Sequence, residues 1–142
     1  IGYRLVGSEM CIRDRLKGQV DMTKILYVED NEDNVYMLSR RLKRKGFEIV
    51  VATDGEMGVE MASSEKPDLI LMDLSLPKMD GWTATKTIKS KNELNKIPII
   101  ALSAHAMEEH KKRALDAGCN DYDTKPVDIE RLLNKINKQL GL

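Results

Sequence analysis

The chain has 142 residues with 23 Lys plus Arg and 23 Asp plus Glu, and this charge balance argues against general electrostatic binding of nucleic acid. Hydrophobic residues make up 42%, and no run approaches the roughly 18 apolar residues that span a membrane, so we expect a soluble, cytoplasmic protein. The two cysteines, Cys11 and Cys119, are too few for a disulfide framework or a zinc site.

The first segment, residues 1–21, differs from the rest because it shows no sustained helical or strand period. Part of it, V-G-S-E-M-C-I-R-D-R, resembles a translated sequencing adapter. We therefore expect residues 1–21 to be non-native or disordered, and residues 22–142 to form the domain, with Met22 as the native start. A genuine N-terminal extension, or the end of a preceding linker, is the alternative interpretation.

From Met22 onward, apolar runs of strand length alternate with segments of helical period. The strands are expected at residues 24–28, 47–52, 68–72, 97–102 and 120–124. The helices are expected to follow them: one closed by Gly46, one capped by Asp54, two at residues 81–90 and 106–117, and a last one capped by Asp128.

Five strands that alternate with five helices predict right-handed crossovers and a parallel sheet covered on both faces. Of the two common doubly wound orders, only the flavodoxin-like order 2-1-3-4-5 fits five strands. The predicted fold class is therefore α/β, a (βα)5 three-layer sandwich. Within it, Trp82 and Ile88 are expected to be buried, and the methionines at helical spacing are expected to fill the core.

Polar residues follow four of the predicted strands, at the edge where ligands bind in such sheets. They are Glu29 and Asp30, Asp73, Ser103 and Lys125, after the first, third, fourth and fifth strands respectively. The three acids contribute −3 and the lysine +1, which leaves −2 in one small crevice. Like charges repel at such distances, and a hard divalent cation cancels the excess.

A metal at this edge would use oxygen ligands, as Mg²⁺ (or Mn²⁺) prefers. We expect direct ligation by Asp30 and Asp73, ligation by the glutamate through water, and a backbone carbonyl from Ser75. With the metal in place, Asp73 can act as a nucleophile toward phosphorus, while Lys125 neutralises charge on the transferring phosphoryl group. A phosphoryl group on Asp73 would then draw Ser103 and Lys125 toward its oxygens and move their loops.

Four motifs carry these residues in order: I-L-Y-V-E-D-N at 25–31, L-I-L-M-D-L-S-L-P-K-M-D-G at 69–81, A-L-S-A at 101–104 and Y-D-T-K-P at 122–126. Together they resemble the receiver domain of bacterial two-component response regulators, over essentially all of residues 22–142. Each motif alone is weak, but four at the family's spacing are highly specific. The closest likeness is to stand-alone receivers and to receivers attached to hybrid sensor kinases.

The resemblance implies that Asp73 accepts a phosphoryl group from a histidine kinase or a histidine phosphotransfer protein. It implies that Mg²⁺ is held by the acid pair Glu29 and Asp30. Ser103 would be the switch hydroxyl, Tyr122 the switch aromatic and Lys125 the phosphate counter-ion, with a cis bond between Lys125 and the proline that follows it.

The resemblance also gives roles to Ser75 and His105, which lie two residues beyond Asp73 and Ser103 and would tune the lifetime of the phosphoryl group. The expected output is a change in the surface formed by the fourth helix, fifth strand and fifth helix, which would bind a downstream protein partner. Such a protein is a signalling module with at most self-catalysed phosphotransfer and dephosphorylation. We expect a monomer or weak dimer, with no direct nucleic-acid contact and no membrane insertion.

Four alternatives remain open on the sequence. The chain could be the receiver fragment of a hybrid sensor kinase, or a pseudo-receiver that binds partners without phosphate. An aspartyl-nucleophile phosphatase of the haloacid-dehalogenase type would carry a second acid two residues after its nucleophile, where this chain has Ser75. A nucleotide-binding enzyme is disfavoured because residues 81–87 lack the glycine that a P-loop needs before its Lys-Thr pair.

Overall fold

The structure is a computed structural model that describes residues 23–74, 79–104 and 108–141. Its strands are β1 (Lys24–Val28), β2 (Glu48–Ala52), β3 (Leu69–Asp73), β4 (Ile99–Ser103) and β5 (Asp121–Thr124). Its helices are α1 (Glu32–Arg44), α2 (Gly55–Glu65), α3 (Gly81–Lys89), α4 (Glu108–Ala117) and α5 (Ile129–Leu140). The prediction for residues 1–21 lies outside the described residues.

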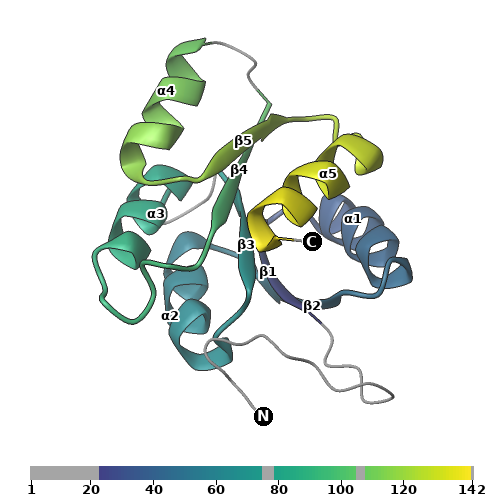
Figure 1. The fold of residues 1–142 in the computed structure, drawn as a ribbon, viewed down its shortest axis with the longest axis horizontal. Coiled ribbons are helices and arrows are strands. Elements are labelled where there is room, and N and C mark those ends of the chain that lie inside the picture. Colours follow the sequence, from purple (N-terminus) through teal and green to yellow (C-terminus); the bar gives the residue numbers. More distant parts are fainter. Residues whose placement is uncertain (1–22, 75–78, 105–107, 142) are drawn as a thin grey trace.

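The five strands form one parallel sheet in the order β2-β1-β3-β4-β5, which confirms the predicted fold class and strand order. Figure 1 shows α2, α3 and α4 on one side of this sheet and α1 and α5 on the other. Of the helices in the described residues, none is long and apolar enough to cross a bilayer.

The strand bounds match the predicted ranges to within two residues. The largest difference is at the start of β4, which begins at Ile99 rather than at residue 97. Pro98 has no N–H to donate to a ladder, so it stands just before the strand, where its carbonyl accepts from the Ile70 N–H at 2.9 Å. The predicted caps at Asp54 and Asp128 are confirmed, since each carboxylate accepts a backbone N–H of its helix.

Two apolar layers sandwich the sheet. The strand residues that face α1 and α5 pack with buried leucines and isoleucines of those helices, and the opposite strand residues pack with α2, α3 and α4. β3 is buried along its whole length because it lies in the middle of the sheet. The central position of β3 brings its last residue, Asp73, to the middle of the edge where the strands end.

Two residues predicted to be buried, Trp82 and Met57, lie nearer the surface, and Met37 of α1 is exposed as well. Trp82 is only partly buried, and the guanidinium of Arg113 covers its ring at 3.8 Å from the centroid. Met37 is 53% exposed and Met57 is 38% exposed, whereas the methionine in β3 is fully buried. An apolar side chain at helical spacing is buried only when it lies on the inward face, and on α1 that face belongs to Leu38.

Candidate functional site

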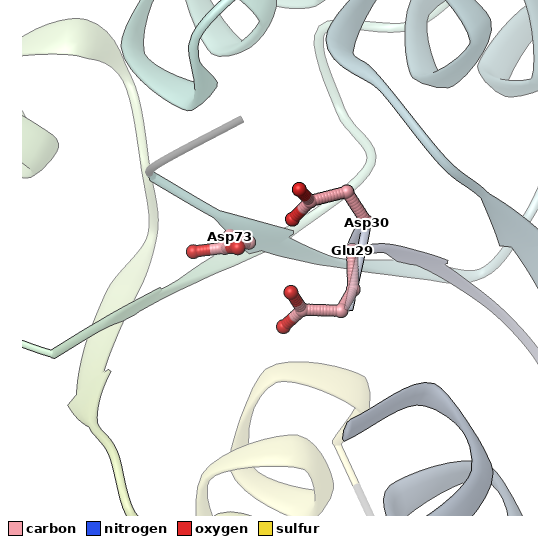
Figure 2. A group of neighbouring side chains, drawn as sticks. All are labelled: Glu29, Asp30 and Asp73. Atoms are coloured by element: carbon pink, nitrogen blue, oxygen red, sulfur yellow. The ribbon is translucent and has the colours of Figure 1, made fainter. Parts of the chain in front are cut away.

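Three carboxylates meet beyond the carboxyl ends of β1 and β3 (Figure 2). Glu29 and Asp30 follow β1, and Asp73 ends the neighbouring strand β3. One carboxylate oxygen from each lies within 4.8 Å of the others. Figure 2 shows the three side chains projecting to the same side of the strand ends. Three acids that are far apart in the sequence therefore form one cluster, as the strand-end argument predicts.

The cluster is unevenly buried. Glu29 is 1% exposed and Asp73 is 3% exposed, whereas Asp30 is open to solvent. Two buried carboxylates this close need a compensating charge, because burial removes the water that would solvate them. The exposed Asp30 leaves the cluster open on one side, so that an ion or a phosphoryl group can approach it.

Lys125 supplies the compensating charge. Its Nζ lies 3.0 Å from Oε1 of Glu29 and 3.3 Å from Oδ1 of Asp73, although β5 is two strands away from β3. Its backbone N–H donates to the Ser103 carbonyl at 2.8 Å, which ties the ends of β4 and β5 together. The Lys125–Pro126 peptide bond is cis, as the family resemblance implies.

The surroundings of Glu29 keep it ionised. Burial opposes the charge, but hydrogen bonding with Asp73 and Lys125, the charge of Lys125 and the Asn31 N–H outweigh it and hold the pKa of Glu29 below its usual range. For Lys125, burial alone would lower the pKa, yet hydrogen bonding to Glu29 and the charges of both buried acids raise it. The ammonium and its carboxylate therefore remain a charged pair at neutral pH.

Tyr27 is a site residue that the sequence interpretation missed. It lies two residues before Glu29, on the same side of β1, and its hydroxyl donates to Oε1 of Glu29 at 3.3 Å. Burial, followed by the charge of Glu29, raises the pKa of Tyr27, so the phenol remains a neutral donor. The two-residue strand period was the available signal: a tyrosine two positions before a functional acid shares its face.

The predicted switch residues lie on neighbouring strands. Ser103 ends β4 and is buried, and Tyr122 is buried in β5 against the core side that contains Ala114 and Cys119. Their switching roles stay predictions. The predicted tuning residues, Ser75 and His105, lie outside the described residues, as does the Ser75 carbonyl predicted as a metal ligand.

Two glycines let the main chain approach closely near the end of β3. A Cβ at Gly81 would lie 2.3 Å from the backbone oxygen of Asp73 and 2.7 Å from Cα of Leu74. A Cβ at Gly55 would lie 2.0 Å from the backbone oxygen of Met79. Because the obstructing atoms are main chain, they cannot swing aside as a flexible side chain would. Each glycine follows an aspartate cap, and the repeated Asp-Gly pair was the signal in the sequence.

Gly81→Ala should lower the free energy of unfolding by about 1–3 kcal/mol, because the new methyl group overpacks the backbone at the end of β3. Urea unfolding followed by circular dichroism measures this loss. Gly58→Ala, on the first turns of α2, is the matched control, since the atoms nearest its Cβ would be side-chain carbons of Val28, at 3.0 Å or more. Equal losses in the two variants would contradict the backbone contact as the cause.

Comparisons with known proteins agree with this geometry. Residues 25–137 match the family described as the response regulator receiver domain. The chain is 36% identical over 117 residues to the polar-differentiation response regulator DivK of Brucella anthropi, a match that covers 82% of this chain and 95% of that protein. It is 37% identical over 121 residues to DivK of Brucella ovis, covering 84% and 98% of the two chains.

Solved structures show the same likeness. The receiver domain of the sensor histidine kinase PA1611 from Pseudomonas aeruginosa PAO1, which has a magnesium ion coordinated in its active-site cleft, is 34% identical with a TM-score of 0.80. That match covers 86% of this chain and all of the other. The receiver domain of Ssk1 from Saccharomyces cerevisiae, solved with the histidine phosphotransfer protein Ypd1, is 33% identical with a TM-score of 0.78, covering 83% and 88%.

Proposed function

Because this chain is a response regulator receiver domain, we propose that it takes a phosphoryl group from a histidine kinase or a histidine phosphotransfer protein onto Asp73, with Mg²⁺. The observation that carries the proposal is the meeting of Glu29, Asp30 and Asp73 within reach of the Lys125 ammonium. Receiver domains are signalling modules, and we propose that the only chemistry here is phosphotransfer to Asp73 and loss of that group.

The donor set fits a hard divalent cation. It consists of carboxylate oxygens alone, and with Lys125 it carries a charge of −2 that Mg²⁺ (or Mn²⁺) would cancel. We propose that Asp30 and Asp73 hold the metal directly, with Glu29 through water and the backbone carbonyl of Ser75 completing the shell. The magnesium ion coordinated in the active-site cleft of the PA1611 receiver supports a divalent metal at this site. When bound, the metal neutralises charge on the phosphoryl group.

The chain's own residues prepare the transfer. An oxygen of the Asp73 carboxylate attacks phosphorus, the new O–P bond forms, and the P–N bond to the donor histidine breaks. The Lys125 Nζ lies 3.3 Å from Oδ1 of Asp73 and holds this carboxylate in place at the end of β3. As the phosphoryl group arrives, the Lys125 ammonium offsets the charge on its oxygens. Glu29 stays ionised beside Lys125 and keeps the lysine at the site.

The phosphoryl group would then change the surface that partners meet. We propose that Ser103 moves toward the phosphoryl oxygens and that Tyr122 turns into the space it leaves, which shifts an existing equilibrium of the α4–β5–α5 face. A downstream protein would bind this altered face, in the cytoplasm, and the chain itself would be a monomer or weak dimer. The likeness to DivK and to the PA1611 receiver fits either a stand-alone regulator or a receiver of a hybrid kinase.

Labelling with acetyl phosphate tests the function. With Mg²⁺, intact-mass spectrometry should show one phosphoryl group per chain, and digestion should place it on the peptide that contains Asp73. Labelling should fall at least 100-fold in EDTA, and hydroxylamine should remove the group, as expected for an acyl phosphate. Absence of labelling by acetyl phosphate and by phosphorylated histidine donors would leave a pseudo-receiver. Multiple-turnover hydrolysis of p-nitrophenyl phosphate would instead support the aspartyl phosphatase.

A further inference from the structure

A third buried carboxylate, outside the cluster of Glu29, Asp30 and Asp73, lies at the edge of the sheet. Asp123 in β5 is 3% exposed, and its Oδ1 accepts from Arg131 Nε at 2.7 Å and from the Thr124 N–H at 2.8 Å. Its Oδ2 is buried and has no hydrogen-bond partner among the described residues. The mechanism proposed above makes no use of this charge.

Two cationic side chains of α5 contact β5 at several points. Arg131 also donates to the Thr124 carbonyl at 3.3 Å, and Lys135 donates to the Tyr122 carbonyl. The Lys135 ammonium further lies 3.8 Å from the Asp121 carboxylate and 3.9 Å from Oδ1 of the buried acid. Arg131 and Lys135 are four residues apart and so share one face of α5. We call Asp123, Arg131 and Lys135 the β5–α5 clasp.

The clasp is an unexpected way to hold a strand to a helix. The Arg131 side chain is 43% exposed, and ion pairs with a solvent-exposed partner contribute little to stability, so stability alone does not account for the clasp. Around the clasp, α5 and the sheet already pack through Leu132, Ile136 and Leu102. Apolar contacts allow α5 to slide along β5. The salt bridges and main-chain hydrogen bonds of the clasp fix the position of α5 along the strand.

The strand that the clasp holds is the one that ends at the acidic site. Lys125, whose ammonium contacts both buried acids there, lies two residues beyond Asp123. Tyr122, which precedes Asp123, points to the opposite side of the sheet and packs in the other apolar layer. A shift at the end of β5 therefore acts on Lys125, on Tyr122 and on the clasp together.

We propose that the β5–α5 clasp is a set of positioning residues that makes α5 move with β5 when the acidic site is phosphorylated; this rests on the function proposed above. A phosphoryl group on Asp73 draws the Lys125 ammonium away from its contacts with the two acids and moves the end of β5. Because Arg131 and Lys135 hold both the Asp123 carboxylate and main-chain carbonyls, α5 follows the strand and does not slide past it.

The test follows α5 amide resonances by nuclear magnetic resonance as Mg²⁺ and beryllofluoride, a phosphoryl analogue, are added. The main variant is Asp123→Leu combined with Arg131→Met, which removes both charges and leaves neither unpaired. We expect the shift of the amides at residues 132–137 to fall at least threefold, while Mg²⁺ affinity and labelling of Asp73 stay within twofold of wild type.

Two further variants separate positioning from mere folding. Asp123→Asn keeps an oxygen for Arg131 and Thr124 and should retain more than half of the α5 shift. Glu65→Gln removes an ion pair of 3.2 Å between β1 and α2, at the other end of the sheet, and should retain all of it. Should the double variant fail to fold, Lys135→Gln replaces it and is expected to lose at least half of the shift.

If the α5 amide resonances of the double variant shift as far as those of wild type, the proposed role of the clasp is wrong. A loss of equal size in Glu65→Gln would overturn it as well, because any weakened ion pair would then suffice. Failure of the proposed function looks different: wild type would show neither labelling nor any beryllofluoride-dependent shift, at the acidic site or elsewhere.

Discussion

Asp73→Asn should raise the free energy of unfolding in EDTA by about 1 kcal/mol while it abolishes labelling by acetyl phosphate. Asp73 is buried beside Glu29 and Asp30, and like charges about 4 Å apart repel by about 1 kcal/mol in water and about 4 kcal/mol at an effective dielectric constant near 20. The variant removes the repulsions of Asp73 with Glu29 and Asp30, and it also removes the attraction to Lys125. The expected gain in the free energy of unfolding is the small difference between these effects.

Mg²⁺ should reverse the order of stability. At about 100 times its Kd, a metal that binds only the folded chain adds about 2.7 kcal/mol, and wild type gains this more fully than a variant that lacks the Asp73 carboxylate. Urea unfolding in EDTA and in Mg²⁺ measures both terms. Asp123→Asn is the control of opposite sign: that carboxylate faces cations, so its loss should destabilise the chain in either buffer. A variant at Asp73 that is less stable than wild type in EDTA would contradict the repulsion.

Lys125→Met should lower the free energy of unfolding by about 2 kcal/mol at pH 7 and slow labelling at least tenfold. Without the ammonium, the Glu29 and Asp73 carboxylates are buried together with no cation between them. The raised pKa of Lys125 means that its stabilising contribution is fully present below its ordinary pKa of 10.5 and is lost only in more alkaline solution. The loss measured at pH 7 therefore reflects the whole ion pair.

The loss of stability in Lys125→Met should depend on pH. At pH 5 one of the two carboxyl groups can take up a proton, which removes most of the repulsion, so the loss of stability should be smaller than at pH 7. Lys24→Met is the control, because Lys24 pairs with Glu65 at 3.2 Å at the opposite end of the sheet. It should cost less than about 1 kcal/mol and leave labelling unchanged. A loss that does not depend on pH would count against the acid pair as its origin.

The fold and the acidic cluster could be predicted because they follow from short-range patterns and one topological rule. Apolar runs of strand length predict which residues lie in the sheet. Parallel strands bring their carboxyl ends to one edge of it. Glu29, Asp30 and Asp73 follow those runs, so their meeting needs no knowledge of side-chain packing. Lys125 was predictable on the same ground, since it follows the last strand.

Contacts that depend on side-chain direction and loop path were not predictable in this way. The clasp requires Arg131 and Lys135 to lie over the edge of β5, and the angle between α5 and the sheet decides that. Met37 is 53% exposed although it is apolar, because the inward face of α1 belongs to its neighbour Leu38. Position 81 requires a glycine because the chain passes close to the backbone at the end of β3. No periodic pattern in the sequence indicates this path.

The clasp also bears on how this protein can associate. An edge strand normally offers unpaired main-chain groups to which a strand of another chain can add, and this is a common route to aggregation. In β5 the carbonyls of Tyr122 and Thr124 are already bound by α5, and the flanking side chains are acidic. Strand addition there would have to break charged contacts first. Concentrated protein should therefore resist growth into fibres from this edge, and a binding partner should recognise helix surfaces and loops in preference to extending the sheet.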